Sequence, residues 1–77
     1  MDGVAMEIEI RRIRCVGDDG AWLTVVEYRH RTSSTMAGRR RELIGAGRLA
    51  LATGEPVRYI DPDTFEVLGS GELLRRL

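Results

Sequence analysis

The sequence predicts an all-β protein, a small antiparallel meander that forms a barrel or roll of roughly five to six short strands. Three observations predict it. Apolar and polar residues alternate near the N-terminus, turn-forming residues recur roughly every 8–12 residues, and residues 57–77 have the pattern of a β-hairpin with its turn residues in place. Helical and strand-like segments do not alternate, so a parallel α/β sheet is not expected.

The first predicted strand, residues 6–16, changes phase along its length. Its apolar residues fall on even positions up to Ile10 and on odd positions from Ile13 onward. A straight strand would place these two sets on opposite faces of a sheet. We therefore expect a β-bulge near Arg11-Arg12, which would restore a single apolar face.

A turn at Asp18-Asp19-Gly20 leads into the second predicted strand, residues 22–31. This strand is apolar on both faces at its start, as a central strand would be. Residues 32–38 contain several hydroxyl groups and show no periodicity, so they are predicted to form a mobile loop.

Residues 39–52 fit either a helix or two short strands. Gly45 and Gly47 would each cost a helix interior about 1 kcal/mol relative to alanine. The strand interpretation is therefore favoured, with a kink at Gly45-Ala46-Gly47 between strands at residues 40–44 and 48–52. A turn follows, and its Pro56 belongs at the start or edge of a strand because proline donates no backbone hydrogen bond.

The closing stretch is predicted to be a hairpin that organises the fold. Its turn is Asp61-Pro62-Asp63-Thr64, in which the Asp61 carboxylate accepts a backbone amide. The apolar residues before and after this turn are expected to pair across the two strands: Val57, Tyr59, Phe65 and Val67. Gly69-Ser70-Gly71 ends the second strand, and the leucines of residues 73–77 fit a last strand or a short helical turn.

Length and composition predict a single small β domain, residues 1–77. A chain of this size buries only about 60% of its unfolded surface, and the resulting thin core favours self-association, most simply as a homodimer. The one cysteine, Cys15, excludes an intramolecular disulfide and fits a reducing cytoplasm. There is no signal-peptide pattern and no run near the ~20 apolar residues of a membrane span.

The sequence shows no pattern typical of an enzyme. Cys15 continues an apolar alternation, which is typical of a buried thiol. His30 would lie near Met6 in the first hairpin, far from that thiol, so a Cys-His pair is not expected. The proline between Asp61 and Asp63 is typical of a turn and not of a calcium loop. We therefore predict no catalytic residue, no cofactor and no metal site.

All twelve basic residues are arginine and twelve residues are acidic, so the formal net charge is zero. This balance argues against a dedicated nucleic-acid binder, and GC-rich codon usage explains the absence of lysine more simply than a functional demand does. One segment departs from the balance, because six arginines and one glutamate lie between Arg29 and Arg48. It is a candidate surface for phosphate or a partner. Its candidate residues are Tyr28, Arg29, His30, Arg31, Arg39, Arg40 and Arg41.

The favoured interpretation is a non-enzymatic binding or assembly module that associates with itself or with a protein partner. The alternative is a small barrel that binds nucleic acid through the arginines at residues 29–41. Against the alternative, charged residues also protect the edges of sheets from aggregation. An enzyme is the least expected class, because the sequence offers only isolated acids and bases.

Overall fold

The computed structural model describes residues 3–36 and 38–77, and every regular element within them is a β-strand. Six antiparallel strands pair in chain order and close into a ring, which confirms the predicted all-β meander. The described residues contain no helix that could cross a membrane. The strands are β1 (Gly3–Val16), β2 (Trp22–Met36), β3 (Arg39–Leu51), β4 (Pro56–Asp61), β5 (Thr64–Val67) and β6 (Leu73–Arg76).

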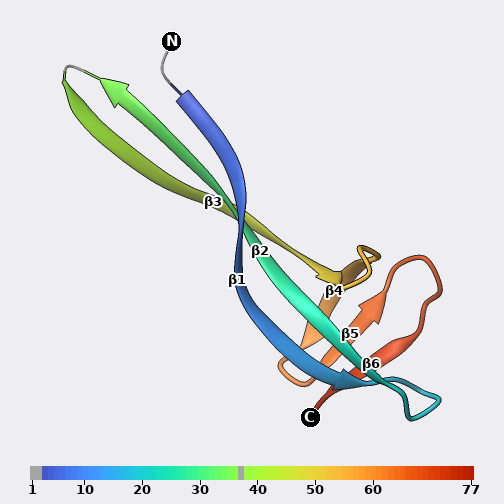
Figure 1. Ribbon diagram of the computed structural model, residues 1–77. Helices are drawn as coiled ribbons and strands as arrows, with labels where there is room; N and C mark the ends of the chain where they lie inside the picture. The colour runs from blue at the N-terminus through green and yellow to red at the C-terminus, as the bar shows by residue number, and fades with distance from the viewer. Residues whose placement is uncertain (1–2, 37) are drawn as a thin grey trace.

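The molecule has two regions, a barrel and an arm, and measures 54 × 21 × 18 Å. It is elongated because β1, β2 and β3 have 14, 15 and 13 residues, whereas β4, β5 and β6 have 6, 4 and 4. The three long strands leave the barrel together and project as a three-stranded ribbon (Figure 1). We call this ribbon the arm and define it as residues 3–9, 29–36 and 39–47.

Two irregularities in strand pairing separate the arm from the barrel. The β1–β2 register shifts between Glu9 and Arg11, within a residue of the predicted bulge. The β2–β3 register shifts between Arg29 and Arg31, opposite the predicted glycine kink. Bulges bend a strand and increase its twist, so the arm leaves the barrel where both ladders are interrupted.

Every buried hydrophobic side chain among the described ones lies in the barrel. Phe65 and Leu74 are its largest fully buried side chains, and Cys15 is buried beside them. Val25 and Val26 are both completely buried, which confirms that β2 is apolar on two faces at its start. The buried core cluster consists of Ile13, Cys15, Val25, Leu51, Val57, Phe65, Val67 and Leu74.

The closing hairpin forms as predicted. Val57 pairs with Val67 and Tyr59 pairs with Phe65 across β4 and β5. The Asp63 amide donates a 2.9 Å hydrogen bond to the Asp61 carboxylate, which caps the turn. The Tyr59 side chain remains 58% exposed and meets the Phe65 ring edge to face, with 6.2 Å between the ring centres.

The barrel closes through a short ladder between the first and last strands. Cys15 pairs with Arg76 and Val16 with Arg75. The Leu77 amide adds a 3.0 Å hydrogen bond to the Arg14 carbonyl. The last strand therefore forms in place of the helical turn that residues 73–77 would also have fitted.

Two predictions about the middle of the chain need correction. The predicted loop at residues 32–38 is wrong for residues 32–36, because β2 continues to Met36 and pairs with both of its neighbours. Backbone hydrogen bonds and the β propensity of threonine suffice there, since none of the six described strands forms a second layer on the arm that would impose an apolar period. Residues 39–51 form one strand, so the strand interpretation is confirmed but the division into two separate strands is not.

Candidate binding surfaces

Strand pairing spreads the predicted arginine segment along the arm. Arg29 pairs with Gly47 and Arg31 with Ile44, at the base of the arm. Arg39 pairs with Met36 near its far end, about 20 Å beyond Arg29 at roughly 3.3 Å per residue. The register therefore does not gather the predicted residues at one loop. The side chains of Arg39, Arg40 and Arg41 lie outside the described residues.

One face at the base of the arm is polar and internally paired. The Arg48 guanidinium donates two hydrogen bonds, of 2.6 and 2.7 Å, to the Glu7 carboxylate. It also lies 4.5 Å from the centre of the Tyr28 ring. These hydrogen bonds lower the pKa of Glu7 and raise the pKa of Arg48. His30 pairs with Glu7 on this face, so two predicted site residues, Tyr28 and His30, lie beside an ion pair that is already formed.

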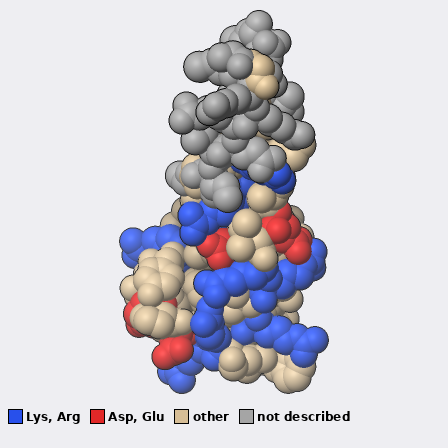
Figure 2. Space-filling model, turned by 90° about the vertical axis from the view of Figure 1, so that its left-hand side faces the viewer, with Lys and Arg blue, Asp and Glu red and all other residues tan. Residues whose placement is uncertain are grey.

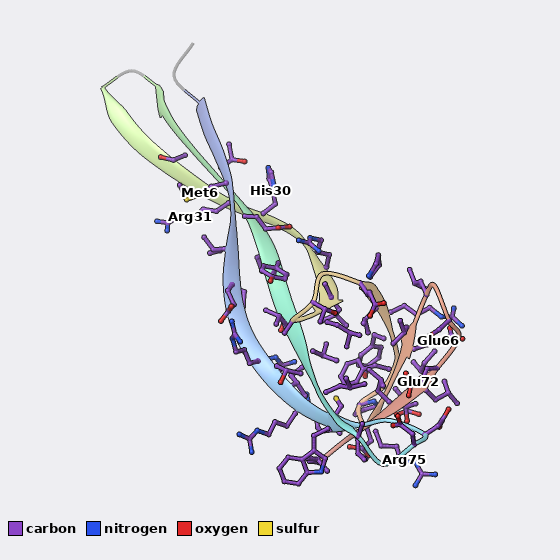
Figure 3. The ribbon with its side chains drawn as sticks, turned by 45° about the vertical axis from the view of Figure 1, so that its right-hand side comes forward. Met6, His30, Arg31, Glu66, Glu72 and Arg75 are labelled. Carbon is purple, nitrogen blue, oxygen red and sulfur yellow. The ribbon has the colours of Figure 1, made fainter. Side chains whose placement is uncertain are left out.

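The opposite face of the arm carries apolar side chains. Met6 pairs with Arg31 and Ile8 with Arg29. Figure 3 shows the Met6 and Arg31 side chains pointing to one side of the arm and the His30 side chain to the other. The β1 bulge places the apolar residues before it and those after it on the same face of the sheet. The apolar face of the arm therefore continues the inner face of the barrel. None of the strands in residues 3–36 and 38–77 covers it, and Met6 is 50% exposed.

The arm also has two unpaired strand edges. β1 pairs with β6 only at Cys15 and Val16, so its other edge is unpaired along residues 3–9. β3 pairs with β4 only at Leu49 and Ala50, so its outer edge is unpaired along residues 39–47. β2 lies between these two edges and keeps them apart within one chain.

A hollow of about 390 Å³ opens where the long strands leave the barrel, and we call it the mouth. Ile13 and Phe65 contribute apolar side chains to its lining, and Tyr59 contributes an exposed ring. Charged groups also line it. Glu27 accepts a 2.7 Å hydrogen bond from Arg11 and lies 3.5 Å from the Arg29 guanidinium, and the basic lining also includes Arg48 and Arg76.

A second hollow, of about 280 Å³, follows the junction of β1 with the end of the chain. It shares Arg11, Ile13 and Arg76 with the mouth, and its other lining residues include Arg12 and Arg14. Arginine side chains spread widely over the barrel on the side seen in Figure 2, which is the left-hand side of Figure 1. We call the set Arg11, Arg12, Arg14, Arg76 and Trp22 the seam surface.

Trp22 stands at one end of the seam surface. Its side chain is 68% exposed, and the Arg14 guanidinium lies 5.7 Å from the ring centre. Arg12 is held by two 3.0 Å hydrogen bonds to Glu9, which raise the pKa of Arg12 and lower that of Glu9. Sequence reasoning missed this surface. The signal available in the sequence was the Arg-Arg-Ile-Arg run at residues 11–14, which is followed, after one predicted turn, by the only tryptophan.

The single thiol belongs to the structural core. Cys15 is fully buried, and this burial raises the pKa of its thiol. It pairs with Leu23, whereas His30 pairs with Glu7 much farther along the same ladder. The prediction of a buried thiol remote from the histidine is therefore confirmed. Within residues 3–36 and 38–77, no three His, Cys, Asp or Glu side chains gather as metal ligands would.

No protein-family model matches the chain, and no curated protein or solved structure matches it either. We therefore infer function from the geometry of the arm and of the barrel.

Proposed function

We propose that this protein is a non-enzymatic, cytoplasmic assembly module that associates with a second copy of itself through the arm. The observation that carries the proposal is the arm's combination of two unpaired edges with one uncovered apolar face. Unpaired edges are templates for another strand. A sheet with an apolar face is most stable when a second layer covers that face.

Charge favours a second copy as the occupant. The arm segment of β1 carries Glu7 and Glu9, whereas the β3 segment carries the arginine run at residues 39–41 and one glutamate, Glu42. Glu7 and Glu9 each have an arginine partner in their own chain, but a carboxylate can accept from two guanidinium groups, as Glu27 does. The β3 edge of a second chain is therefore still attracted to the β1 edge. β2 separates the two edges within one chain, so they meet only when they come from two chains. Forming this contact twice gives a closed, two-fold dimer.

The test is the mass of the protein in solution, measured by sedimentation equilibrium over a range of concentrations. We expect the mass of two 8.6 kDa chains at high concentration. Met6→Lys places a charge on the apolar face and should shift the equilibrium to the monomer. Leu68→Lys is the matched control, because Leu68 is 55% exposed but lies in the barrel beyond β5. The control variant should remain a dimer.

Salt provides a second readout. If charged edges attract each other, the dissociation constant should rise with ionic strength, because exposed charges are screened. A wild-type protein that stays monomeric at high concentration would overturn the proposal. Equal dissociation of the Met6→Lys and Leu68→Lys variants would also do so, because the contact would then not involve the arm.

A further inference from the structure

The seam surface lies on the barrel, apart from the arm, and carries a local excess of positive charge. The two hollows that meet there are bordered by six arginines, which are Arg11, Arg12, Arg14, Arg29, Arg48 and Arg76. Three carboxylates, Glu7, Glu9 and Glu27, bind four of these arginines. The local excess is therefore three positive charges. The net charge of zero is a sum over the whole chain and does not exclude this patch.

Two of the arginines are available for a ligand. In the part of the chain that the structure describes, neither Arg14 nor Arg76 has a carboxylate partner. Both are exposed, and both line the hollow beside β1. Guanidinium groups bind phosphate oxygens with two parallel hydrogen bonds, so this pair suits consecutive phosphates of a chain.

Each of the two arginines shares its surroundings with an exposed aromatic ring. The Arg14 guanidinium lies over the Trp22 ring, and Tyr59 and Arg76 both line the mouth. Both rings are more than half exposed. Large exposed rings beside cationic groups form stacking platforms, and nucleic-acid bases stack on such rings regardless of their sequence.

From this arrangement we infer that the seam surface, together with Tyr59 at the mouth, binds single-stranded nucleic acid. Arg14 and Arg76 hold backbone phosphates, and Trp22 and Tyr59 stack unpaired bases. Stacking on rings requires bases that are not already paired, so a duplex is a poorer ligand. This binding site is separate from the proposed assembly contact, because it uses neither the edges nor the apolar face of the arm.

The test uses a fluorescein-labelled, mixed-sequence single strand of about 12 nucleotides, a length within the range that small barrels bind. Fluorescence anisotropy should show binding at about 50 mM salt that weakens strongly by about 200 mM. Trp22 is the only tryptophan, so its intrinsic fluorescence reports directly on the surface. Bound bases that stack on its ring should quench that fluorescence.

Matched substitutions locate the site. Arg14→Gln and Arg76→Gln should each weaken binding several-fold and flatten the slope of log affinity against log salt by about 0.7. Arg58→Gln removes the same charge from an exposed arginine that pairs with Glu66 on β4 and β5, and it should leave binding unchanged. Met6→Lys should also leave the affinity for the single strand unchanged. Loss of the dimer can therefore be distinguished from loss of nucleic-acid binding.

Three results would overturn the inference. One is the absence of binding at low salt. Another is an equal loss of affinity in the Arg58→Gln and Arg14→Gln variants. The third is binding of inorganic polyphosphate or duplex DNA as tight as that of the single strand, with no change in Trp22 fluorescence, because the surface would then recognise charge alone.

Discussion

The same three long strands run through both the barrel and the arm, but different forces hold the two regions. The barrel buries a core that includes Phe65 and Leu74, whereas none of the described side chains of the arm is buried. The arm is held by its backbone ladder and by surface contacts such as the Glu7–Arg48 pair. Hydrophobic burial dominates folding, and exposed ion pairs contribute little. The barrel thus has its own source of stability, and the described side chains of the arm supply no comparable burial.

The largest expected effect comes from the barrel core. Phe65→Ala should destabilise the protein by about 3–5 kcal/mol, because it removes a fully buried ring and leaves a cavity. Ile8→Ala in the arm should cost less than about 1 kcal/mol in the monomer, since that side chain is only partly buried. Urea unfolding of both variants measures the difference. Similar losses at the two sites would contradict the division into two regions.

A smaller effect is expected at the junction between the regions. A Cβ atom at Gly47 would lie 3.0 Å from the Tyr28 carbonyl oxygen and 3.2 Å from the Arg29 side chain. Gly47→Ala should therefore destabilise the protein by about 1–3 kcal/mol. The control is Gly45→Ala, whose Cβ would come no closer than 3.7 Å to His30. In thermal unfolding, Gly45→Ala should be neutral or slightly stabilising. A larger loss of stability for Gly45→Ala than for Gly47→Ala would contradict the prediction.

The smallest effect concerns the ion pair at the base of the arm. Arg48 lowers the pKa of Glu7 in the folded chain, so this pair stabilises the fold above the unfolded pKa of Glu7 and ceases to do so as pH falls through the folded pKa. Arg48→Gln should raise the pKa of Glu7 toward its ordinary value in an NMR titration. Glu9, whose pKa is lowered by Arg12, is the internal control and should not move. An unchanged Glu7 pKa would show that the pair does not form.

The barrel could be predicted from the sequence because burial imposes a pattern on it. The phase change after Ile10 predicted the bulge, and the residues on either side of Asp61-Pro62-Asp63-Thr64 predicted the closing hairpin. The outer part of the arm could not be predicted in this way. The six described strands form one closed sheet and supply no second layer for the outer arm, so the sequence of residues 32–36 needs no apolar period, and hydroxyl residues there resemble a loop.

The candidate surfaces were predicted less well, for a topological reason. Arg29 and Arg31 lie close in sequence to the run at residues 39–41, but an extended hairpin separates them in space. Arg14 and Arg76 lie far apart in sequence, yet ring closure between β1 and β6 brings them together. Counting charges along the sequence detects the arginines between residues 29 and 41, but it does not detect Arg14 and Arg76 as neighbours.

The central claim is that the barrel is complete in one chain and the arm is completed by a second. Amide hydrogen exchange, measured at low and at high protein concentration, tests it most directly. Amides of the core strands, such as those of Val25 and Phe65, should be equally protected at both concentrations. Those of residues 3–9 that face the unpaired edge of β1 should gain protection only at the higher concentration. Equal protection of these arm amides at both concentrations would contradict the claim.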